Sequence, residues 1–475
     1  MVKIFQILLI FITSLLLAAC GGGGGGGGSS GEAVGGGAIP QCSENASYVD
    51  GEYNFMGNGG TYTSTNLYGL GSVCASAAYG RGATGDGQLI AVLDSGISVG
   101  EGTTTDLNQI NSNIATFLTG SDVINSDNVP QDDDNNNNTA VGSGHGSHVA
   151  GLIANEHNNS SFGGHGIAYD ATLHIIKVLD EDGSGSFAQI AAGMDLARGV
   201  SSMDIVNLSL GSSGVIGSTC DSASSCETAL GSTIYTAMEA LGSASIIQVY
   251  AAGNDGNSSP NTLAGAAIYD DDFKETTVIA VAIDSTGNLA SYSDKCGVAK
   301  AICIAAPGSS LYSFFSSNAQ SSYAVDSYAQ SMSGTSQAAP LVSGGLALIK
   351  QEFSSLTNAQ VIDRLLATAL DTGEYSKSTI YGHGLMNLNG ATAAVAKLQT
   401  INGSNLLDDP NTSYYDLAHN SFLSSAAFSN ALNNALAGHT MEVYDSFDRA
   451  NFDVAGYSFF TSGSYTSQNT LKIIW

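Results

Sequence analysis

Four polar residues of the types used in nucleophilic catalysis occur in the order Asp, His, Asn and Ser, each beside glycine and small residues. Asp94 ends an apolar run, and His145 opens a segment of small residues. Asn254 follows a second apolar run, and Ser336 lies in a glycine-led turn before a long apolar segment. An Asp-His pair can activate a serine hydroxyl, and a backbone N–H at a helix start can stabilise a developing negative charge. These residues are therefore candidates for acyl transfer through a serine.

Each of these residues also has an ordinary structural interpretation. Asp94 can close a strand into a glycine turn, and Asn254 can occupy a turn with unusual backbone angles. Ser336 can serve as a helix N-cap. His145 and His148 lie three residues apart, as two metal ligands on a helix can, but the sequence lacks the Glu of a His-Glu-x-x-His motif and has the wrong spacing. The metal interpretation is therefore the weaker one.

The segments around these residues predict an α/β fold with a doubly wound, mostly parallel sheet and helices on both faces. Runs that are apolar on both faces predict buried strands at residues 89–93, 173–179, 204–210, 246–251 and 277–283. Helical periodicity predicts helices at residues 145–154, 186–198, 227–242, 335–352 and 358–370. Thr357 and Gln360 form a capping box for the last helix. The ligand crevice of such a sheet lies beyond the carboxyl ends of its strands.

The four segments, in this order and at these separations, resemble the signature blocks of subtilisin-like serine proteases. The resemblance extends over residues 76–398, and its further matching stretches are Gly166–Ala168, Asp182–Gly185, Asn207–Gly211, Ala306–Gly308 and Tyr381–Gly384. One position departs from the family pattern, because Gln337 stands beside Ser336 where the family usually has Met.

The resemblance implies a serine endopeptidase that acts on protein or peptide substrates. Asp94 would orient His145, His145 would take a proton from Ser336, and the Asn254 amide would stabilise the oxyanion. The substrate would lie between two backbone segments as an added strand, formed by Gly183, Ser184 and Gly185 and by Ser209, Leu210 and Gly211. The alternative is a catalytically silent adhesion or display module on the same fold.

The chemistry requires no cofactor, although a structural calcium ion is compatible with the family resemblance. Asp106, Asn158 and Asn159 are weak candidates for its ligands. The chain has 42 acidic against 13 basic residues and a formal net charge of -29. Such a surface repels nucleic acid, so we expect no nucleic acid partner. We expect a monomer.

The first twenty residues have the pattern of a secretory signal, with Lys3 before an apolar stretch that ends in Leu17-Ala18-Ala19-Cys20. This ending resembles the lipobox of bacterial lipoproteins, in which Cys20 would be lipidated and anchor the protein to a membrane. Gly21 after the cysteine is compatible with sorting to the outer membrane of a Gram-negative bacterium. An ordinary signal peptide with an incidental cysteine is the alternative.

Six cysteines remain after Cys20, and an even number in an exported chain suggests disulfides. Proximity in the sequence favours three pairs: Cys220 with Cys226, Cys296 with Cys303, and Cys42 with Cys74. The spacing lacks the Cys-x-x-Cys pairs of zinc sites.

The chain is expected to divide into a signal peptide (1–20), a Gly-rich linker (21–38), an N-terminal extension (39–75), a peptidase domain (76–398) and a C-terminal extension (399–475). The extension includes a predicted helix around residues 424–441. The Gly-rich start, residues 83–87 and the stretch Met441–Arg449 resemble autotransporter proteases of Gram-negative bacteria, in which a barrel would follow. We expect a location at the cell surface or in the periplasm, and residues 399–475 are either a simple extension or the linker to a missing barrel.

Overall fold

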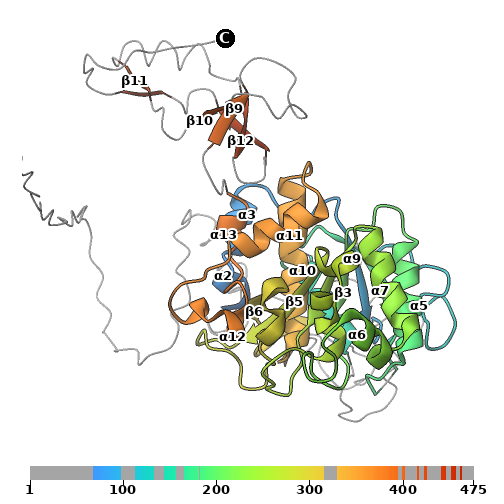
Figure 1. Ribbon diagram of the computed structural model, residues 1–475. Coiled ribbons are helices and arrows are strands. Elements are labelled where there is room, and N and C mark those ends of the chain that lie inside the picture. Colours follow the sequence, from blue (N-terminus) through green and yellow to red (C-terminus); the bar gives the residue numbers. More distant parts are fainter. Residues whose placement is uncertain are drawn as a thin grey trace, which may run out of the picture. The chain divides into compact units, whose positions relative to one another are not determined.

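The computed structural model describes residues 68–97, 113–132, 144–156, 165–180, 182–314 and 329–393, together with six short strands between residues 398 and 462. Figure 1 shows a sheet with helices on both sides. The sequence-based candidates Cys20, Cys42, Asp106, Asn158 and Asn159 lie outside the described residues.

The central sheet has six parallel strands in the order β2-β1-β3-β4-β5-β6. The strands are β1 (Leu89–Asp94), β2 (Thr172–Lys177), β3 (Ile205–Leu208), β4 (Ile247–Ala251), β5 (Thr277–Ile283) and β6 (Cys303–Pro307). The first five were predicted from their apolar runs, and the doubly wound α/β fold is confirmed. The sixth strand, β6, was not predicted.

Alternate residues of each strand enter two separate hydrophobic clusters, because successive side chains point to opposite faces of a sheet. In β5, Val278, Ala280 and Ala282 join one cluster. Ile279, Val281 and Ile283 join the other. The first cluster includes helices α3 (Ala75–Gly80), α4 (His145–Ala154), α10 (Thr335–Glu352) and α11 (Asn358–Ala367). The second includes helices α5 (Phe187–Arg198), α6 (Ala223–Leu230) and α7 (Ser232–Ser243).

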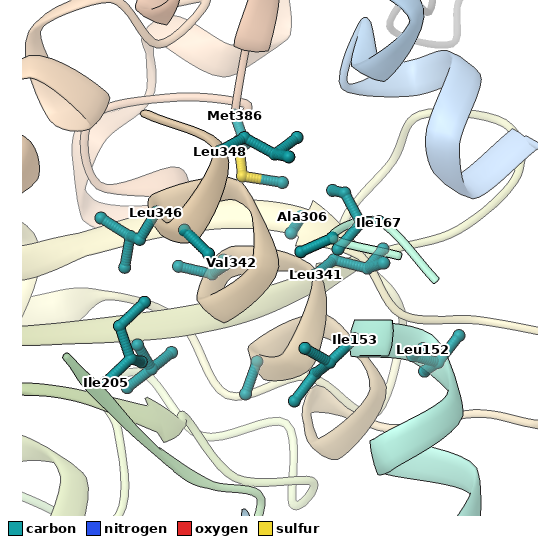
Figure 2. Packing of buried hydrophobic residues seen from close by; sticks show 14 of the residues in the cluster. Leu152, Ile153, Ile167, Ile205, Ala306, Leu341, Val342, Leu346, Leu348 and Met386 are labelled. Atoms are coloured by element: carbon teal, nitrogen blue, oxygen red, sulfur yellow. The ribbon is translucent and has the colours of Figure 1, made fainter. Parts of the chain in front are cut away.

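Helix α10 lies at the centre of the first cluster and carries the candidate nucleophile Ser336 in its first turn. Figure 2 shows Leu341, Val342 and Leu346 of this helix among side chains of the sheet and of α4. Burying one such side chain contributes about 1.5–3 kcal/mol. The helix approaches its neighbours closely, since a Cβ at Gly344 would lie 2.0 Å from Ile167 Cγ2. This packing fixes the start of α10 relative to the sheet.

Two helix boundaries show how local sequence decides the elements. Residues 227–242 were predicted as one helix, but Gly231 has φ +90° and separates α6 from α7. Glycine tolerates this angle, which lies outside the helical range, so the single-helix prediction was wrong. The predicted capping box of Thr357 and Gln360 is present at α11, and Ser186 with Gln189 forms a second one at α5.

Shorter elements complete the described part of the chain. Tyr68 near the N-terminal end anchors this region, because its hydroxyl hydrogen bonds to Ser309 O at 2.6 Å. The remaining helices are α2 (Tyr68–Ser72), α8 (Thr262–Gly265), η2 (Ala266–Tyr269), α9 (Asp271–Lys274), η3 (Gly297–Ile302), η4 (Gly373–Ser376), α12 (Ser378–Tyr381) and α13 (Leu388–Ala391). Strands β7 (Leu311–Phe314) and β8 (Ala329–Met332) form an antiparallel pair.

The C-terminal segments form strands with one another. The strands are β9 (Leu398–Ile401), β10 (Tyr414–Asp416), β11 (Phe422–Ser424), β12 (Thr440–Asp445), β13 (Asn451–Ala455) and β14 (Phe460–Ser462). Four of them pair in the order β10-β9-β12-β13, and β11 pairs with β14. Both ends of the helix predicted around residues 424–441 are therefore strands, and its middle lies outside the described residues. Within the part of the chain that the structure describes, no helix has the length and apolar character needed to cross a membrane.

Candidate active site

A buried carboxylate and a histidine meet at the end of the first strand. Asp94 is the last residue of β1, and His145 is the first residue of α4. His145 Nδ1 lies 2.7 Å from Asp94 Oδ1, and the Asp94 side chain is 0% exposed. The helix can come this close because Gly146 has no side chain. A Cβ at this position would lie only 2.2 Å from Gly96 O. The pairing leaves Nε2 as the ring nitrogen free of the carboxylate.

The groups around His145 have opposite effects on its pKa. Burial lowers the pKa of His145, but the charge of Asp94, the hydrogen bond to Asp94 and the charge of Asp132 together raise it above its ordinary value of about 6.5. The imidazolium form is therefore stabilised, which suits a base that must hold a proton during a reaction.

Ser336 is the second residue of α10 and is joined to the end of β3 by two hydrogen bonds. Its hydroxyl donates to Ser209 O at 3.1 Å, and its carbonyl accepts from Ser209 Oγ at 2.8 Å. In a regular helix the carbonyl of Ser336 would accept from the N–H of residue 340. Pro340 has no N–H, so this carbonyl is available to Ser209. The N-cap position belongs to Gly334, so the N-cap interpretation of Ser336 was wrong.

A buried chain of polar side chains supports Ser209 from behind. Asn207 Nδ2 donates to Ser209 Oγ at 3.0 Å, and Ser343 Oγ donates to Asn207 Oδ1 at 2.8 Å. Ser343 lies inside α10 and is 0% exposed. This chain links α10 to β3 at two levels, through Ser336 and through Ser343.

Asn254 follows β4 and is held by the residue before Ser336. Its Oδ1 accepts from the Thr335 N–H at 2.8 Å and from Thr335 Oγ1 at 3.0 Å. This arrangement directs Nδ2 away from Thr335. A Cβ placed on Gly334 would lie 3.4 Å from Asn254 Nδ2 and 3.5 Å from Ser336 N. Two N–H donors therefore flank one small space at the start of α10.

All four residues gather at one edge of the sheet. β1, β3 and β4 are parallel, so their carboxyl ends, which carry Asp94, Ser209 and Asn254, meet at the same edge. The hydrogen bonds of His145 and Ser336 bring the starts of α4 and α10 to this edge as well. The position agrees with the crevice expected for a doubly wound sheet.

The two predicted substrate segments lie after β2 and β3. Residues 183–185 form an exposed turn, in which Asp180 Oδ1 accepts from the Ser184 N–H at 2.8 Å. Ser209 and Leu210 are buried, whereas Gly211 is exposed and packs on Asn261. Neither segment is part of a strand in this structure.

His148 takes no part in this constellation. Its side chain is 0% exposed, and Nε2 hydrogen bonds to Leu311 O at 3.1 Å. His145 is committed to Asp94 through Nδ1. The two histidines therefore have separate partners, which argues against the metal interpretation.

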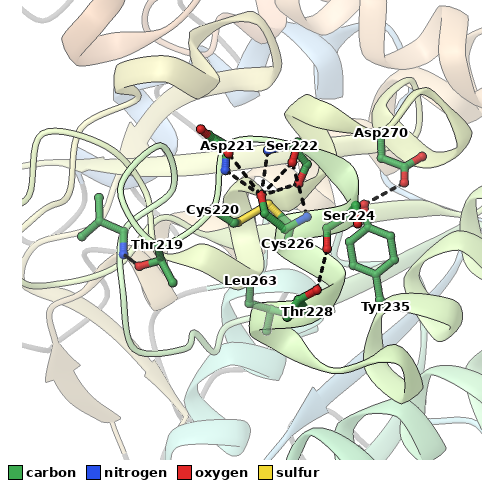
Figure 3. The surroundings of a disulfide bond; sticks show 12 residues. Thr219, Cys220, Asp221, Ser222, Ser224, Cys226, Thr228, Tyr235, Leu263 and Asp270 are labelled. Atoms are coloured by element: carbon green, nitrogen blue, oxygen red, sulfur yellow. Dashed lines mark hydrogen bonds between the residues drawn. A yellow bond between two sulfur atoms is a disulfide. The ribbon is translucent and has the colours of Figure 1, made fainter.

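Two disulfides are present among the described residues: Cys220–Cys226 and Cys296–Cys303. Figure 3 shows the first beside Ser222, the N-cap of α6. Cys74 is also disulfide-bonded, and its predicted partner Cys42 lies outside the described residues.

One acidic cluster was not predicted from the sequence. Glu239, Asp270 and Asp272 place carboxylate oxygens within 4.8 Å of one another. Burial raises the pKa of Glu239, and the charges of Asp270 and Asp272 raise it further. Asp270 already accepts the Tyr235 hydroxyl at 2.7 Å, and calcium takes about six to eight oxygen ligands. The cluster alone does not make a calcium site.

The residues that hold the candidates in place were not predicted from the sequence. Neither Thr335 nor Ser343 was singled out from the sequence. A serine inside an otherwise apolar helix was the available signal for Ser343, since such a hydroxyl requires a partner.

Residues 85–384 match the subtilase family. The chain is 35% identical over 325 residues to Subtilisin Savinase of Lederbergia lenta, which covers 68% of this chain and 98% of that protein. It is 34% identical over 326 residues to Subtilisin DY of Bacillus licheniformis, and the match covers 68% of this chain and 97% of that protein. It is 34% identical over 331 residues to Subtilisin E of Bacillus subtilis (strain 168), and the match covers 70% of this chain and 72% of that protein. The chain therefore belongs to the subtilase family and is a subtilisin-like serine endopeptidase.

Proposed function

We propose that Ser336 is the nucleophile of this endopeptidase, with His145 as its general base and Asp94 as the residue that orients His145. Asp94 accepts the Nδ1 proton, so Nε2 is the nitrogen that takes the proton of the Ser336 hydroxyl. The hydroxyl attacks the peptide carbonyl, and His145 then gives the proton to the leaving amine. Water hydrolyses the acyl-enzyme by the same route.

The observation that carries this proposal is the hydrogen bond between His145 and the buried Asp94 at the sheet edge that also holds Ser336. The Ser336 hydroxyl donates to Ser209 O, so it must turn toward His145 before attack. Catalytic hydrogen bonds are often incomplete before substrate binds. The donors beside Gly334, Asn254 Nδ2 and the Ser336 N–H, would receive the oxyanion. One such donor typically contributes about 3 kcal/mol of transition-state stabilisation.

The substrate is proposed to lie extended between residues 183–185 and 209–211. The exposure of Gly183, Ser184 and Gly185 supports this role, because an added strand needs accessible backbone groups. The hydrogen bonds between Ser209 and Ser336 bring the second segment directly to the nucleophile.

A fluorophosphonate probe tests the proposed nucleophile, because it reacts only with an activated serine. We expect the purified full chain to be labelled at Ser336 and to release peptides from unfolded casein. Labelling would be located by mass spectrometry of the peptide that contains residues 333–340.

Heat-unfolded protein serves as the control, since any serine that reacts without the folded site would also be labelled there. Labelling of a different serine in active protein would refute the assignment of Ser336. A folded chain that neither reacts nor cleaves casein would support the silent module instead.

The protein is further proposed to be exported and anchored through a lipid on Cys20, with residues 21–38 as a tether. The two disulfides support export, because disulfides persist mainly in oxidising compartments. The peptidase domain would span residues 76–398 and act as a monomer on protein substrates at the cell surface or in the periplasm. Residues 399–475 would form an extension like that of autotransporter proteases. The proposal also includes a structural calcium ion, for which Asp106, Asn158 and Asn159 are the weak candidate ligands.

Gln337 leads to a prediction about oxidation. Its side chain is 1% exposed and lies at the start of α10, where a Cβ on Gly334 would be 2.8 Å from its Oε1. A glutamine has no thioether to oxidise. We expect the parent enzyme to keep nearly all of its activity in dilute peroxide and Gln337→Met to lose most of it. Residual casein hydrolysis against exposure time measures both.

Mass spectrometry provides the check on this prediction. Loss of activity in Gln337→Met should follow sulfoxide formation at residue 337. Equal inactivation of parent and variant would show that another residue controls sensitivity to peroxide.

A further inference from the structure

A second buried carboxylate, that of Asp294, holds the loop that follows Asn254. Asp294 Oδ1 accepts from the Asn257 N–H at 2.6 Å and from the Asp255 N–H at 3.2 Å. Asp294 Oδ2 accepts from Asn257 Nδ2 at 3.4 Å. Three donors from the residues just after Asn254 therefore converge on one side chain.

The same segment also holds the residue before Asn254. The Asp294 N–H donates to Gly253 O at 2.9 Å. Gly253 has φ +121°, and a Cβ there would lie 2.2 Å from Asp294 Oδ2. Only glycine permits this approach of the carboxylate to the backbone. Asp294 thus contacts the chain on both sides of Asn254.

Neighbouring backbone contacts extend this attachment. The Gly256 N–H donates to Tyr292 O at 2.7 Å, and the Lys295 N–H donates to Asn257 O at 2.9 Å. Residues 292–295 therefore run along residues 253–257. Within residues 292–295, Asp294 is the residue whose side chain accepts hydrogen bonds from the other segment.

Placing an acid here has an energetic cost that a simple loop contact does not require. Asp294 is 0% exposed, and burial raises its pKa, although the hydrogen bonds from Asn257 and Asp255 act in the opposite direction. A buried carboxylate is tolerated when N–H donors satisfy it. The donors that satisfy Asp294 all belong to the Asn254 loop.

Asn254 is thereby held from two directions. Thr335 fixes its side-chain carbonyl oxygen, and Gly253 N–H donates to Thr335 Oγ1 at 3.1 Å. Asp294 fixes the backbone that carries the side chain. Both constraints are needed, because a donor displaced by even about 1 Å loses most of its effect on a transition state.

We propose that Asp294 is a positioning residue that sets the Asn254 amide in place for the oxyanion. The proposal rests on the assignment of Asn254 as an oxyanion donor. It predicts that Asp294 acts on kcat and acts through Asn254, whereas a purely structural carboxylate would affect stability alone.

The test is a double-mutant cycle of Asp294→Asn and Asn254→Ala, measured with a peptide p-nitroanilide that the parent cleaves. We expect Asn254→Ala to lower kcat by about 10²–10³-fold. Asp294→Asn alone should lower kcat by roughly tenfold or more with KM within about twofold. In the Asn254→Ala background, Asp294→Asn should cost less than about twofold, because the group it positions is gone.

Asp284→Asn is the matched control. The Asp284 carboxylate also organises a surface turn, accepting from the Thr286 N–H at 2.9 Å and the Asn288 N–H at 3.1 Å. These contacts do not involve residues 253–257. We expect its replacement to lower the melting temperature and to leave kcat unchanged.

Several outcomes separate the possibilities. An equal loss from Asp294→Asn in both backgrounds, or a loss in KM alone, would overturn the positioning role. A parent with no activity would count against the proposed function rather than against Asp294. If Asp294→Asn does not fold, Asn257→Ala removes only the bond to Oδ2, and its smaller loss of kcat should also vanish in the Asn254→Ala background.

Discussion

Ser336→Ala is expected to lower kcat by about 10⁶-fold, which is the loss that follows removal of the nucleophile from a Ser-His-Asp hydrolase. The neighbouring Thr335 hydroxyl is not placed to replace it, because it donates to Asn254 Oδ1. The substitution removes one bond, from Ser336 Oγ to Ser209 O, and keeps the bond that the Ser336 carbonyl accepts from Ser209 Oγ. The melting temperature should therefore change little. Hydrolysis of casein by parent and variant at equal concentration measures the effect.

Ser333→Ala is the matched control for this prediction. Ser333 lies in the same turn, is exposed, and accepts the Ser310 N–H through its side chain at 2.8 Å. We expect this variant to keep parental kcat. Substantial hydrolysis by folded Ser336→Ala would refute the nucleophile assignment.

Asp94→Asn is expected to lower kcat by about 10⁴-fold near neutral pH. An asparagine can donate to Nδ1, which would stabilise the tautomer with its proton on Nε2. His145 could then no longer accept the proton of Ser336. The exposed Asp86 provides the control, and Asp86→Asn should leave kcat unchanged.

The pH profile adds a second measure of the same pair. His145 acts as a base only when neutral, so parental kcat/KM should fall as pH decreases through its raised pKa, above about 6.5. Asp94→Asn removes the charge and the hydrogen bond of Asp94 that raise this pKa, so that burial, which lowers the pKa, is opposed only by the charge of Asp132 among the causes named above. The acid limb of the residual activity should therefore move to lower pH. An unmoved limb would show that another group controls it.

The elements with strong periodic patterns were predictable from the sequence. β5 occupies the predicted residues 277–283, because an apolar run on both faces has few alternatives to a buried strand. Helix α10 also begins and ends where predicted. The single-helix prediction across Gly231 failed for a local reason. The helical periodicity of the sequence continues past Gly231, but the backbone at this glycine is not helical.

The supports of the site could not be predicted in the same way. Asp294 lies in a segment that resembles an ordinary polar loop, and its partners lie 37–39 positions earlier in the sequence. Neither periodicity nor composition encodes such a pairing. Asp94, Ser336 and Asn254 could be named as candidates because their sequence blocks are distinctive, whereas the contacts of Thr335 and Asp294 form only when the sheet edge is assembled.

The parallel sheet also determines when a new chain becomes able to cut peptides. The Asp94–His145 bond joins residues 51 positions apart, and the Ser209–Ser336 bonds join residues 127 positions apart. Chains dominated by such distant contacts fold slowly. On the proposed assignment, the proton relay, the nucleophile and the oxyanion donor are complete only after the strands have paired and α10 has docked. A partly synthesised chain is therefore inert toward its neighbours, and proteolysis begins as a late event in folding.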